Sequence, residues 1–557
     1  MIPVFTSLHG YKREWLRGDL VAGLTVWAVL VPEALAYATI AGVSPVVGLY
    51  AAPGALILYA ALGSSKHLVT GPMAATAALS AAAVGDIVAG NSDEFVQLTV
   101  VLALCVGVAA LLAGVLRLGF LAGFISEPVL KGFIVGLALT IIVGQVPKLF
   151  GVDTGDGDFF EKLFDFLGNL GETDALTLVV GLGSLAVVLG LRRFAPVVPG
   201  SLVAVLLGIA LVELFDLDVD IVGDIDSGLP SLGLPDASAS DYGSLAAGAI
   251  GVMLVGFAES LGAAKTYAAR HHYEIDANRE LLGLGAANVA SGLSSGMVVN
   301  GSLSKTAVNA SAGARTQASG LVVAAMTVIT LLFLTGLFES LPEATLAAVV
   351  VAALIELVDI PALTALYRVY TRQLGRAYGV AARADFIAAM TALLGVLVLD
   401  TLPGLFLGIA VSLLLLLYRA SRPRIAVLGR IPGAPGQWGD VDRHPENTEV
   451  EGVKVLRVEG GLFFANADSV RARIRAQSRA AHTVVLDAEA TPFVDVSAVR
   501  MLGELHDDLS RAGVNLLITR DVGQVRDVMR RAGADPSLEH VYPTVEDAVT
   551  SARGGAP

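Results

Sequence analysis

Gly71-Pro72-Met73-Ala74-Ala75-Thr76-Ala77 has a counterpart late in the chain, Gly301-Ser302-Leu303-Ser304-Lys305-Thr306-Ala307. Each stretch opens with a helix-breaking glycine, reaches the same Thr-Ala pair and lies inside long apolar sequence. A glutamate precedes each stretch in a matching frame, Glu33 after Val31-Pro32 and Glu259 after Phe257-Ala258. The pattern indicates an internal repeat with one interrupted apolar segment in each half, and such segments point to the binding site of a transporter.

The two interrupted segments predict where an anion would bind. If both are half-helices that begin near the middle of a membrane, the free N–H groups of their first turns point at one another across a gap. The partial positive charge at a helix N-terminus attracts anions. We therefore expect an anion site between the two stretches.

The composition places the chain among membrane proteins. It has 557 residues, 55% of them hydrophobic, and a mean hydropathy of +0.71, far above the soluble average. The net charge of −14 argues against a nucleic-acid partner. With one cysteine and no grouping of nucleophile, base and orienting residue, the sequence predicts no metal site, no cofactor and no enzyme.

The apolar runs predict the transmembrane segments. A bilayer core of about 30 Å needs about 20 apolar residues for each straight helix. The sequence then predicts fourteen segments, seven on each side of an acidic loop after Leu214, with the short ones as broken helices inside a bundle. The expected segments are 19–40, 45–62, 72–89, 95–116, 119–150, 174–193, 198–215, 244–264, 279–293, 302–311, 315–337, 341–358, 384–400 and 403–420.

The charges of the connections predict the orientation. Basic residues such as Lys66, Arg192 and Arg315 fall in or beside alternate connections, on the side of the basic N-terminus. The intervening connections, including the aspartate-rich loop 216–243, carry neither lysine nor arginine. By the positive-inside rule we expect a multi-pass protein of the cell membrane with both termini cytoplasmic.

The composition changes after Tyr418. Residues 421–449 are rich in proline, glycine and charge and are predicted to be a linker. Beyond them, alternating or β-branched runs at 453–458, 482–486 and 514–519 alternate with helical patterns at 467–479, 496–512, 522–532 and 544–551. Alternating strands and helices predict a small α/β domain. The expected divisions are an N-terminal segment 1–18, a transmembrane domain 19–420 (repeats 19–215 and 244–420), the linker 421–449 and the domain 450–557.

Short motifs recur in order from about Trp15 to Ala552. They are Asp19-Leu20-Val21-Ala22-Gly23-Leu24-Thr25, Ala36-Tyr37-Ala38, Gly48-Leu49-Tyr50, Leu62-Gly63-Ser64-Ser65, Gly71-Pro72, Asp276-Ala277-Asn278-Arg279-Glu280-Leu281, the stretch from Gly301 to Asn309, and Leu462-Phe463-Phe464-Ala465-Asn466-Ala467. In this order they resemble the SulP (sulfate permease) family of anion transporters, known in animals as solute carrier family 26. The resemblance implies a seven-plus-seven inverted repeat with core and gate domains, a cytoplasmic STAS domain and a homodimer.

The resemblance places the two glutamates at the transport site. It implies an acidic residue at Glu259, where a carboxylate inside a membrane should be neutral, paired or coupled to a transported cation. Glu33 stands where similar proteins more often have glutamine. Two carboxylates near one anion would repel it, and protonation of one removes the penalty, so we expect proton coupling through Glu33 and Glu259. Each could instead be a passive polar residue of the bundle or of a water-filled cleft.

The remaining candidate substrate-binding residues lie on and around the half-helices. Lys305 stands where the family usually has arginine, and either pairs with Glu259 or Glu33 or contacts the anion directly. Leu303 takes a place that is often aromatic, whereas Tyr37 and Met73 match positions that line the pocket in similar proteins. Ala74, Ala75, Ser302 and Ser304 are candidates mainly for their backbone N–H groups, and Ser304 also for its hydroxyl. Gly301, which opens the second stretch, completes the set.

The STAS motif departs from the phosphorylated form at Asp495-Val496-Ser497, where valine and alanine replace two residues of the Asp-Ser-Ser-Gly turn. We therefore expect Ser497 to serve as a plain helix N-cap.

The preferred function is secondary active transport of a small anion, namely sulfate, bicarbonate or a short dicarboxylate, by proton symport and an elevator-like movement in the lipid bilayer. Sodium-coupled bicarbonate symport and anion exchange are the nearest alternatives. A membrane anion sensor that signals through STAS and a nucleobase permease are further ones. The Asp-Val-Ser turn weakens the sensor hypothesis, and Lys305 disfavours an uncharged base.

Overall fold

The computed structural model describes residues 4–85, 87–88, 93–153, 155, 157–195, 198–223, 225, 227–355, 357–368, 383–533 and 541–554. The chain divides into two compact units. One comprises Met1–Arg368 and Asp385–Ser412, and the other Val369–Ala384 and Leu413–Pro557. We describe each unit by itself.

The first unit contains the predicted membrane helices, except that α17 continues into the second unit from Leu413. Among the described residues, eight helical spans are long and apolar enough to cross a membrane, one of them Glu343–Arg368, which includes α13 and α14, and α3, α8, α12 and α16 are shorter apolar helices. Every predicted segment overlaps a helix, although residues 86, 89 and 356 of the predictions lie outside the described part. The helices are α1 Leu16–Ile40, α2 Pro45–Leu62, α3 Ala74–Gly85, α4 Asp93–Val115, α5 Glu127–Phe150, α7 Ala175–Phe194, α8 Gly200–Phe215, α9 Ala239–Arg270, α10 Ala277–Leu293, α11 Leu303–Ser311, α12 Ala318–Phe333, α13 Glu343–Ile355, α16 Ala384–Leu399 and α17 Thr401–Ala420.

Three short elements depart from the prediction. The expected helix 119–150 is wrong at its start, because Gly119–Phe124 forms a separate 3-10 helix and Pro128 lies in the first turn of α5. Two helices, α6 (Phe159–Gly168) and α14 (Ile360–Arg368), were not expected. Both are too short to cross a bilayer, so a search for long apolar runs passes over them.

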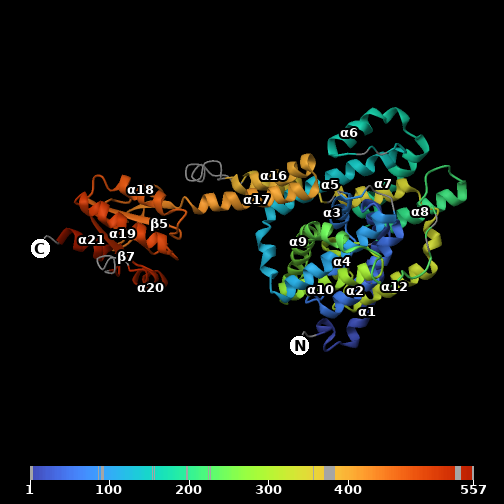
Figure 1. Cartoon of the computed structure of the whole chain (residues 1–557), viewed down its shortest axis with the longest axis horizontal. Helices are drawn as coiled ribbons and strands as arrows, with labels where there is room; N and C mark the ends of the chain where they lie inside the picture. The colour runs from blue at the N-terminus through green and yellow to red at the C-terminus, as the bar shows by residue number, and fades with distance from the viewer. Residues whose placement is uncertain are drawn as a thin grey trace. The chain divides into compact units, whose positions relative to one another are not determined.

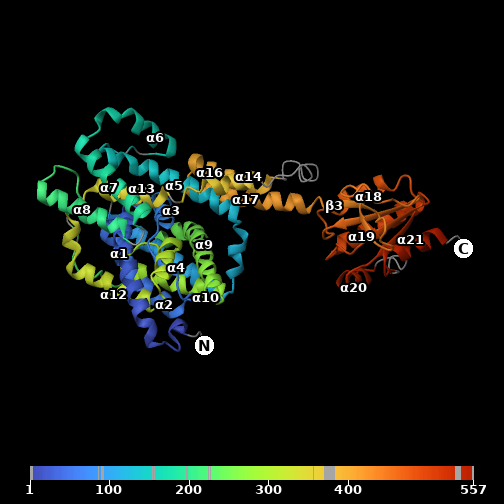
Figure 2. The same ribbon diagram turned by 180° about the vertical axis from the view of Figure 1, so that it is seen from behind.

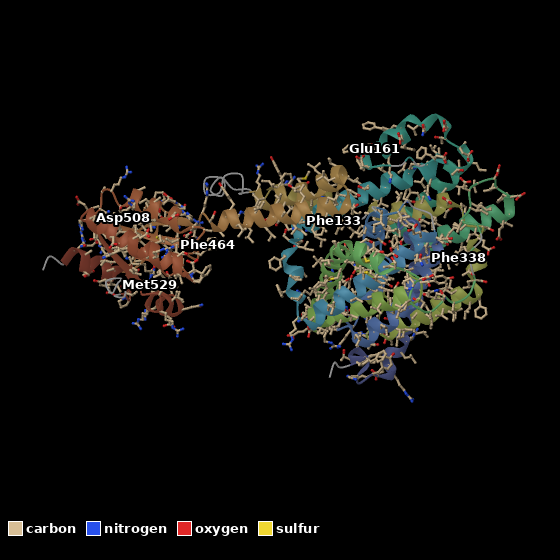
Figure 3. All side chains as sticks on the ribbon, in the orientation of Figure 1. Phe133, Glu161, Phe338, Phe464, Asp508 and Met529 are labelled. Carbon is tan, nitrogen blue, oxygen red and sulfur yellow. The ribbon has the colours of Figure 1, made fainter. Side chains whose placement is uncertain are left out.

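The helices form two groups, visible in Figures 1 and 2. We call α1 to α4 and α9 to α12 the core half: α10 packs against α4 and α2, and α1 packs against α12. We call α5, α7, α8, α13 and α16 the gate half: α13 packs against α5 and α7, with the fully buried Phe133 of α5 labelled in Figure 3. Each group draws helices from both repeats, so the two repeats interlock.

Two buried carboxylates join the repeats inside the core half. Asp19 of α1 accepts hydrogen bonds from the backbone N–H groups of Arg315 (2.6 Å) and Thr316 (3.1 Å), just before α12. Glu280 of α10, in the second repeat, accepts hydrogen bonds from two residues of the first repeat, from the Tyr59 hydroxyl (2.6 Å) and from the Ser64 N–H (2.8 Å). Both acids therefore stabilise loop backbone that would otherwise lack partners.

The interrupted segments meet in a short ladder. Strands β1 (Val69–Gly71) and β2 (Asn300–Ser302) pair antiparallel, with Thr70 opposite Gly301. Helix α3 begins shortly after β1, and α11 begins at the residue after β2. The prediction that the two breaks lie together inside the bundle is confirmed.

The second unit contains the α/β domain. Its six strands run in the order β4-β3-β5-β6-β7-β8, parallel from β5 to β8 and antiparallel at β3 and β4. Figure 3 labels Phe464, Asp508 and Met529 on this unit. The bounds are β3 Arg424–Arg430, β4 Trp438–Asp440, β5 Val453–Glu459, α18 Ala467–Gln477, β6 Thr483–Asp487, α19 Val496–Arg511, β7 Asn515–Thr519, α20 Gly523–Arg531, β8 Val541–Tyr542 and α21 Val545–Gly554.

Two predictions for this domain are wrong. Residues 421–449 are not simply a linker, because β3 and β4 belong to the sheet, where Ile425, Ala426 and Leu428 are buried. The glycines and prolines of this stretch form turns, whereas the strands themselves are short and apolar. Ser497 is not the N-cap of α19, since the Asp495 carboxylate accepts the N–H of Ala498 (2.8 Å) in that role.

Candidate functional site

A cavity of about 290 Å³ lies where the interrupted segments meet the gate half. Core residues from α1, the start of α3, α9 and α11 line one side, and gate residues from α7, α8 and α13 line the other. The lining residues are Thr25, Val29, Glu33, Tyr37, Met73, Ala74, Ala75, Val188, Arg192, Val198, Pro199, Gly200, Ser201, Glu259, Ser302, Ser304, Val308, Ala352, Ala353, Leu354 and Leu357.

Helix α1 supplies one face of the cavity. Thr25, Val29, Glu33 and Tyr37 recur every fourth residue, so they lie on one side of the helix. The stripe runs from the half-helices toward the N-terminal end of α1. The cavity therefore extends from the middle of the bundle toward the side on which the chain enters it.

Lys305 forms a buried ion pair with Glu33. Its Nζ lies 2.6 Å from Glu33 Oε2, and the lysine side chain is 1% exposed. The same Nζ donates a hydrogen bond to the backbone carbonyl of Pro72 (3.2 Å) and lies 4.9 Å from the centre of the Tyr37 ring. These three partners compensate the cost of removing the ammonium from water. Lys305 itself is not among the residues that line the cavity.

Glu259 has a different environment. Its Oε2 accepts a hydrogen bond from the Asn300 side-chain amide (3.2 Å), and no ion pair to Glu259 is found among the described residues. The Ser260 hydroxyl donates to Asn300 Oδ1 and accepts the N–H of Gly301 (2.8 Å). This chain of hydrogen bonds fixes Glu259 to β2, while its carboxylate faces the cavity.

Gly301 supports the site without lining it. A Cβ at this position would meet Leu68 Cδ2 at 2.7 Å and the Ser260 hydroxyl at 2.9 Å. Only glycine therefore allows β2 to pack against α9 while its N–H donates a hydrogen bond to the Ser260 hydroxyl. Gly301 was predicted to bind the substrate, but its N–H is bonded to Ser260 and it is not among the residues that line the cavity.

The half-helices contribute small residues to the cavity. Met73, Ala74 and Ala75 line it at the start of α3, as Ser302 and Ser304 do at the start of α11. The Ser302 hydroxyl is the N-cap of α11 and accepts the N–H of Lys305 (3.2 Å), and it lies 3.1 Å from the Ser304 hydroxyl. Two hydroxyls at a helix N-terminus offer polar contacts to an anion.

The predicted residues divide into two sets. Eight line the cavity: Glu33, Tyr37, Met73, Ala74, Ala75, Glu259, Ser302 and Ser304. Gly301, Leu303 and Lys305 lie outside its lining, and the Leu303 side chain is 53% exposed. Sequence reasoning missed Arg192, whose guanidinium donates to the carbonyl of Ala352 (3.2 Å) in the gate half. It read Arg192 only as a loop charge, because the gate residues have no repeated motif to mark them.

Comparison with protein families finds two matches. The family described as the sulfate permease family matches residues 16–375, and the STAS domain matches residues 444–548. The first match spans the ladder, both glutamates and all cavity residues.

Curated relatives match along nearly the whole chain. A probable sulfate transporter of Mycobacterium tuberculosis is 36% identical over 571 residues, which cover 99% of this chain and 100% of that protein. Probable sulfate transporter 4.2 of Arabidopsis thaliana is 30% identical over 576 residues, covering 99% of this chain and 83% of the relative.

Solved structures share the fold. Murine solute carrier 26 family member A9, an anion transporter, matches with a TM-score of 0.88 and 23% identity, over 98% of this chain and 93% of that one. The transmembrane domain of the cyanobacterial bicarbonate transporter BicA matches with a TM-score of 0.61 and 23% identity, over 71% of this chain and 98% of that one.

Proposed function

This chain belongs to the sulfate permease family of anion transporters, and we propose from that premise that it carries a small oxyanion, first of all sulfate, across the cell membrane. The relatives named as sulfate transporters support this choice of anion. Bicarbonate and short dicarboxylates share the same chemistry of negatively charged oxygens, so they are the other substrates to test.

The cavity that the two half-helices share with the gate half is the observation that carries the proposal. It presents the starts of α3 and α11, where helix N-termini and the hydroxyls of Ser302 and Ser304 can bind oxygens of an anion. Lys305 lies directly behind it and is held in place by Glu33. The positive ends of the half-helices and a fixed cation thus favour negative charge at this place.

We assign the movement to the core half relative to the gate half, as in an elevator. Both half-helices and both glutamates belong to core elements, whereas α7, α8 and α13 complete the opposite wall. An anion bound by the core half could therefore move with it and exchange one gate-side wall for another. We also assign both termini to the cytoplasm, from the charges of the connections, and a homodimer as the assembly.

Proton coupling is assigned chiefly to Glu259. Glu33 is already neutralised by Lys305, whereas Glu259 faces the same cavity with only the Asn300 amide bonded to it among the described residues. An ionised Glu259 repels an entering anion, and a proton on it removes that repulsion. The anion and a proton would then enter together, with Glu33 keeping Lys305 in place.

Uptake into proteoliposomes tests this function. Labelled sulfate and bicarbonate should accumulate when the outside is acidic, and Glu259→Gln should reduce uptake to the level seen without a pH gradient. Replacement of sodium by choline distinguishes the two coupling ions. It should abolish uptake if transport is coupled to sodium and leave uptake unchanged if transport is coupled to protons. Gradient-insensitive flux in the unmodified protein would disprove proton symport, and flux that requires a second anion inside would instead indicate exchange.

A further inference from the structure

The charges that line the cavity are unevenly distributed between its two sides. Glu33 and Glu259 are on the core side, and Arg192 is the only cationic side chain among the described lining residues. Lys305, the cation that the half-helix provides, is paired with Glu33 and points into the protein. The positive charge that a cavity-bound anion meets directly therefore comes from the gate half.

Arg192 is held in a position to act on the cavity. It lies in the last turn of α7, is half-buried, and its guanidinium donates to the carbonyl of Ala352, itself a lining residue of α13. Its charge interacts electrostatically with the Glu33 carboxylate across the cavity. Gly200 and Ser201 of α8 line the same gate-side wall.

The chemistry of the guanidinium suits an oxyanion. It is planar, always charged, and can direct two parallel N–H groups at two oxygens, whereas an ammonium acts as a point charge. A monatomic anion such as chloride cannot use this fork. A contact from Arg192 would therefore favour sulfate or bicarbonate over chloride.

We infer that Arg192 is a gate-side anion-binding residue. It contacts the oxyanion in the arrangement of core and gate halves described here, and this contact is lost when the core half moves. This inference rests on the proposed transport function and adds the second half of the binding site. The charges of the connections assign the connection between α7 and α8 to the side of the basic N-terminus, so we assign the contact to the cytoplasmic access. The anion is thus bound more tightly from the cytoplasm than core residues alone would allow.

The test compares both sides of the membrane. In vesicles of defined orientation, Arg192→Gln should raise the half-saturating sulfate concentration on the cytoplasmic side about tenfold. On the opposite side the change should stay below about twofold, because that access lacks the contact. Arg192→Lys should give an intermediate value with sulfate and bicarbonate, and should match the unmodified protein with chloride.

Arg193→Gln is the matched control. Arg193 occupies the same last turn of α7, but it is exposed and lies over the Phe194 ring, 5.9 Å from its centre. Arg193→Gln removes the same charge as Arg192→Gln does, and it should leave the half-saturating sulfate concentration unchanged on both sides of the membrane. The Arg192→Lys variant keeps the test valid if loss of the bond to Ala352 prevents Arg192→Gln from folding, which size-exclusion chromatography would reveal.

Two results would overturn the inference. If Arg192→Gln behaves as Arg193→Gln does, or raises the half-saturating concentration equally on both sides, Arg192 does not make a gate-side contact. If the unmodified protein shows no saturable anion flux at all, the proposed transport function fails first, and this inference fails with it.

Discussion

Glu33 and Glu259 occupy matching places in the two repeats but have different partners. Glu33 is paired with Lys305 at 2.6 Å, whereas Glu259 accepts only the Asn300 amide among the described residues. The reason is in the half-helices: Lys305 and Ala75 stand at the same position of the repeated stretch. The half-helix of repeat two thus supplies Lys305 as the partner of Glu33 in repeat one. At the matching position, the half-helix of repeat one has Ala75, whose methyl group cannot form an ion pair.

The difference shows how the two halves of an internal repeat can come to differ. A duplicated backbone places two carboxylates beside one cavity, and the residue at one position of the half-helices decides which of them has a cationic partner. In the mechanism proposed above, the paired glutamate is part of the framework and the other one exchanges protons.

The largest effect is expected from removing the cation. Lys305→Met leaves Glu33 buried without its partner and should lower the free energy of unfolding by about 3–5 kcal/mol. Combining it with Glu33→Gln should restore part of that loss, because no charge remains buried. Thermal unfolding of the full chain in detergent measures both.

Lys148→Met is the control for this prediction. Lys148 pairs with Glu343 at 3.1 Å, but the two side chains are 34% and 43% exposed, so its loss should cost at most about 1 kcal/mol. Equal losses at Lys148 and Lys305 would show that burial does not distinguish the two pairs.

Supplying the missing cation should make the two glutamates alike. Ala75→Lys introduces an ammonium at the repeat position that Lys305 occupies, in the cavity that Glu259 also lines. We expect uptake to lose its dependence on the pH gradient, since a paired Glu259 no longer exchanges its proton. Ala75→Met adds similar bulk without charge and should keep the pH dependence of uptake. If uptake by Ala75→Met also becomes independent of the pH gradient, the added bulk and not the charge is the cause.

Removing the hydrogen bond that holds Glu259 should have a moderate effect. Asn300→Ala frees the Glu259 carboxylate and the Ser260 hydroxyl, at a cost of about 1–3 kcal/mol in stability. Asn278→Ala removes a bond to the Gly119 N–H away from the cavity and should cost a similar amount. Only Asn300→Ala should also weaken the stabilisation by sulfate in a thermal-shift assay, and equal weakening in both would contradict a role at the site.

The smallest effect concerns the ring beside Lys305. Tyr37 lies four residues after Glu33, whereas Ala263 lies four residues after Glu259, so only the first repeat has an aromatic partner for a cation. Tyr37→Leu should therefore cost about 1–2 kcal/mol more than Tyr37→Phe, which keeps the ring. Equal stabilities of the two variants would show that the ring contributes by volume alone.

The sequence predicted the helices well because their cause is local. A run of about 20 apolar residues needs no distant partner to be stable in a membrane, and the two glycine breaks were visible as a repeat. The expected strands of the α/β domain were found because their alternating or β-branched pattern is also local. The errors fell on short elements: β3 and β4 lie among the prolines, glycines and charges of a stretch that looked like a linker, and neither α6 nor α14 can span a bilayer alone.

The site was predictable in its position and only partly in its connections. The repeat placed Glu33, Glu259 and the half-helices together, but it left open whether Lys305 would pair with either acid or face the anion. Arg192 could not be found, because nothing in the sequence relates the end of α7 to the half-helices.

The amino-acid sequence was thus enough to predict a membrane protein with two repeats, a glycine break in each, and an α/β domain after them. The folded structure was needed to show that Lys305 pairs with Glu33, that Glu259 is bonded to an amide, and that Arg192 lines the same cavity as both glutamates. Local patterns fix where helices begin and end. The partner of a buried charge depends on which distant segments the fold brings within a few ångströms, where electrostatic interactions are strong.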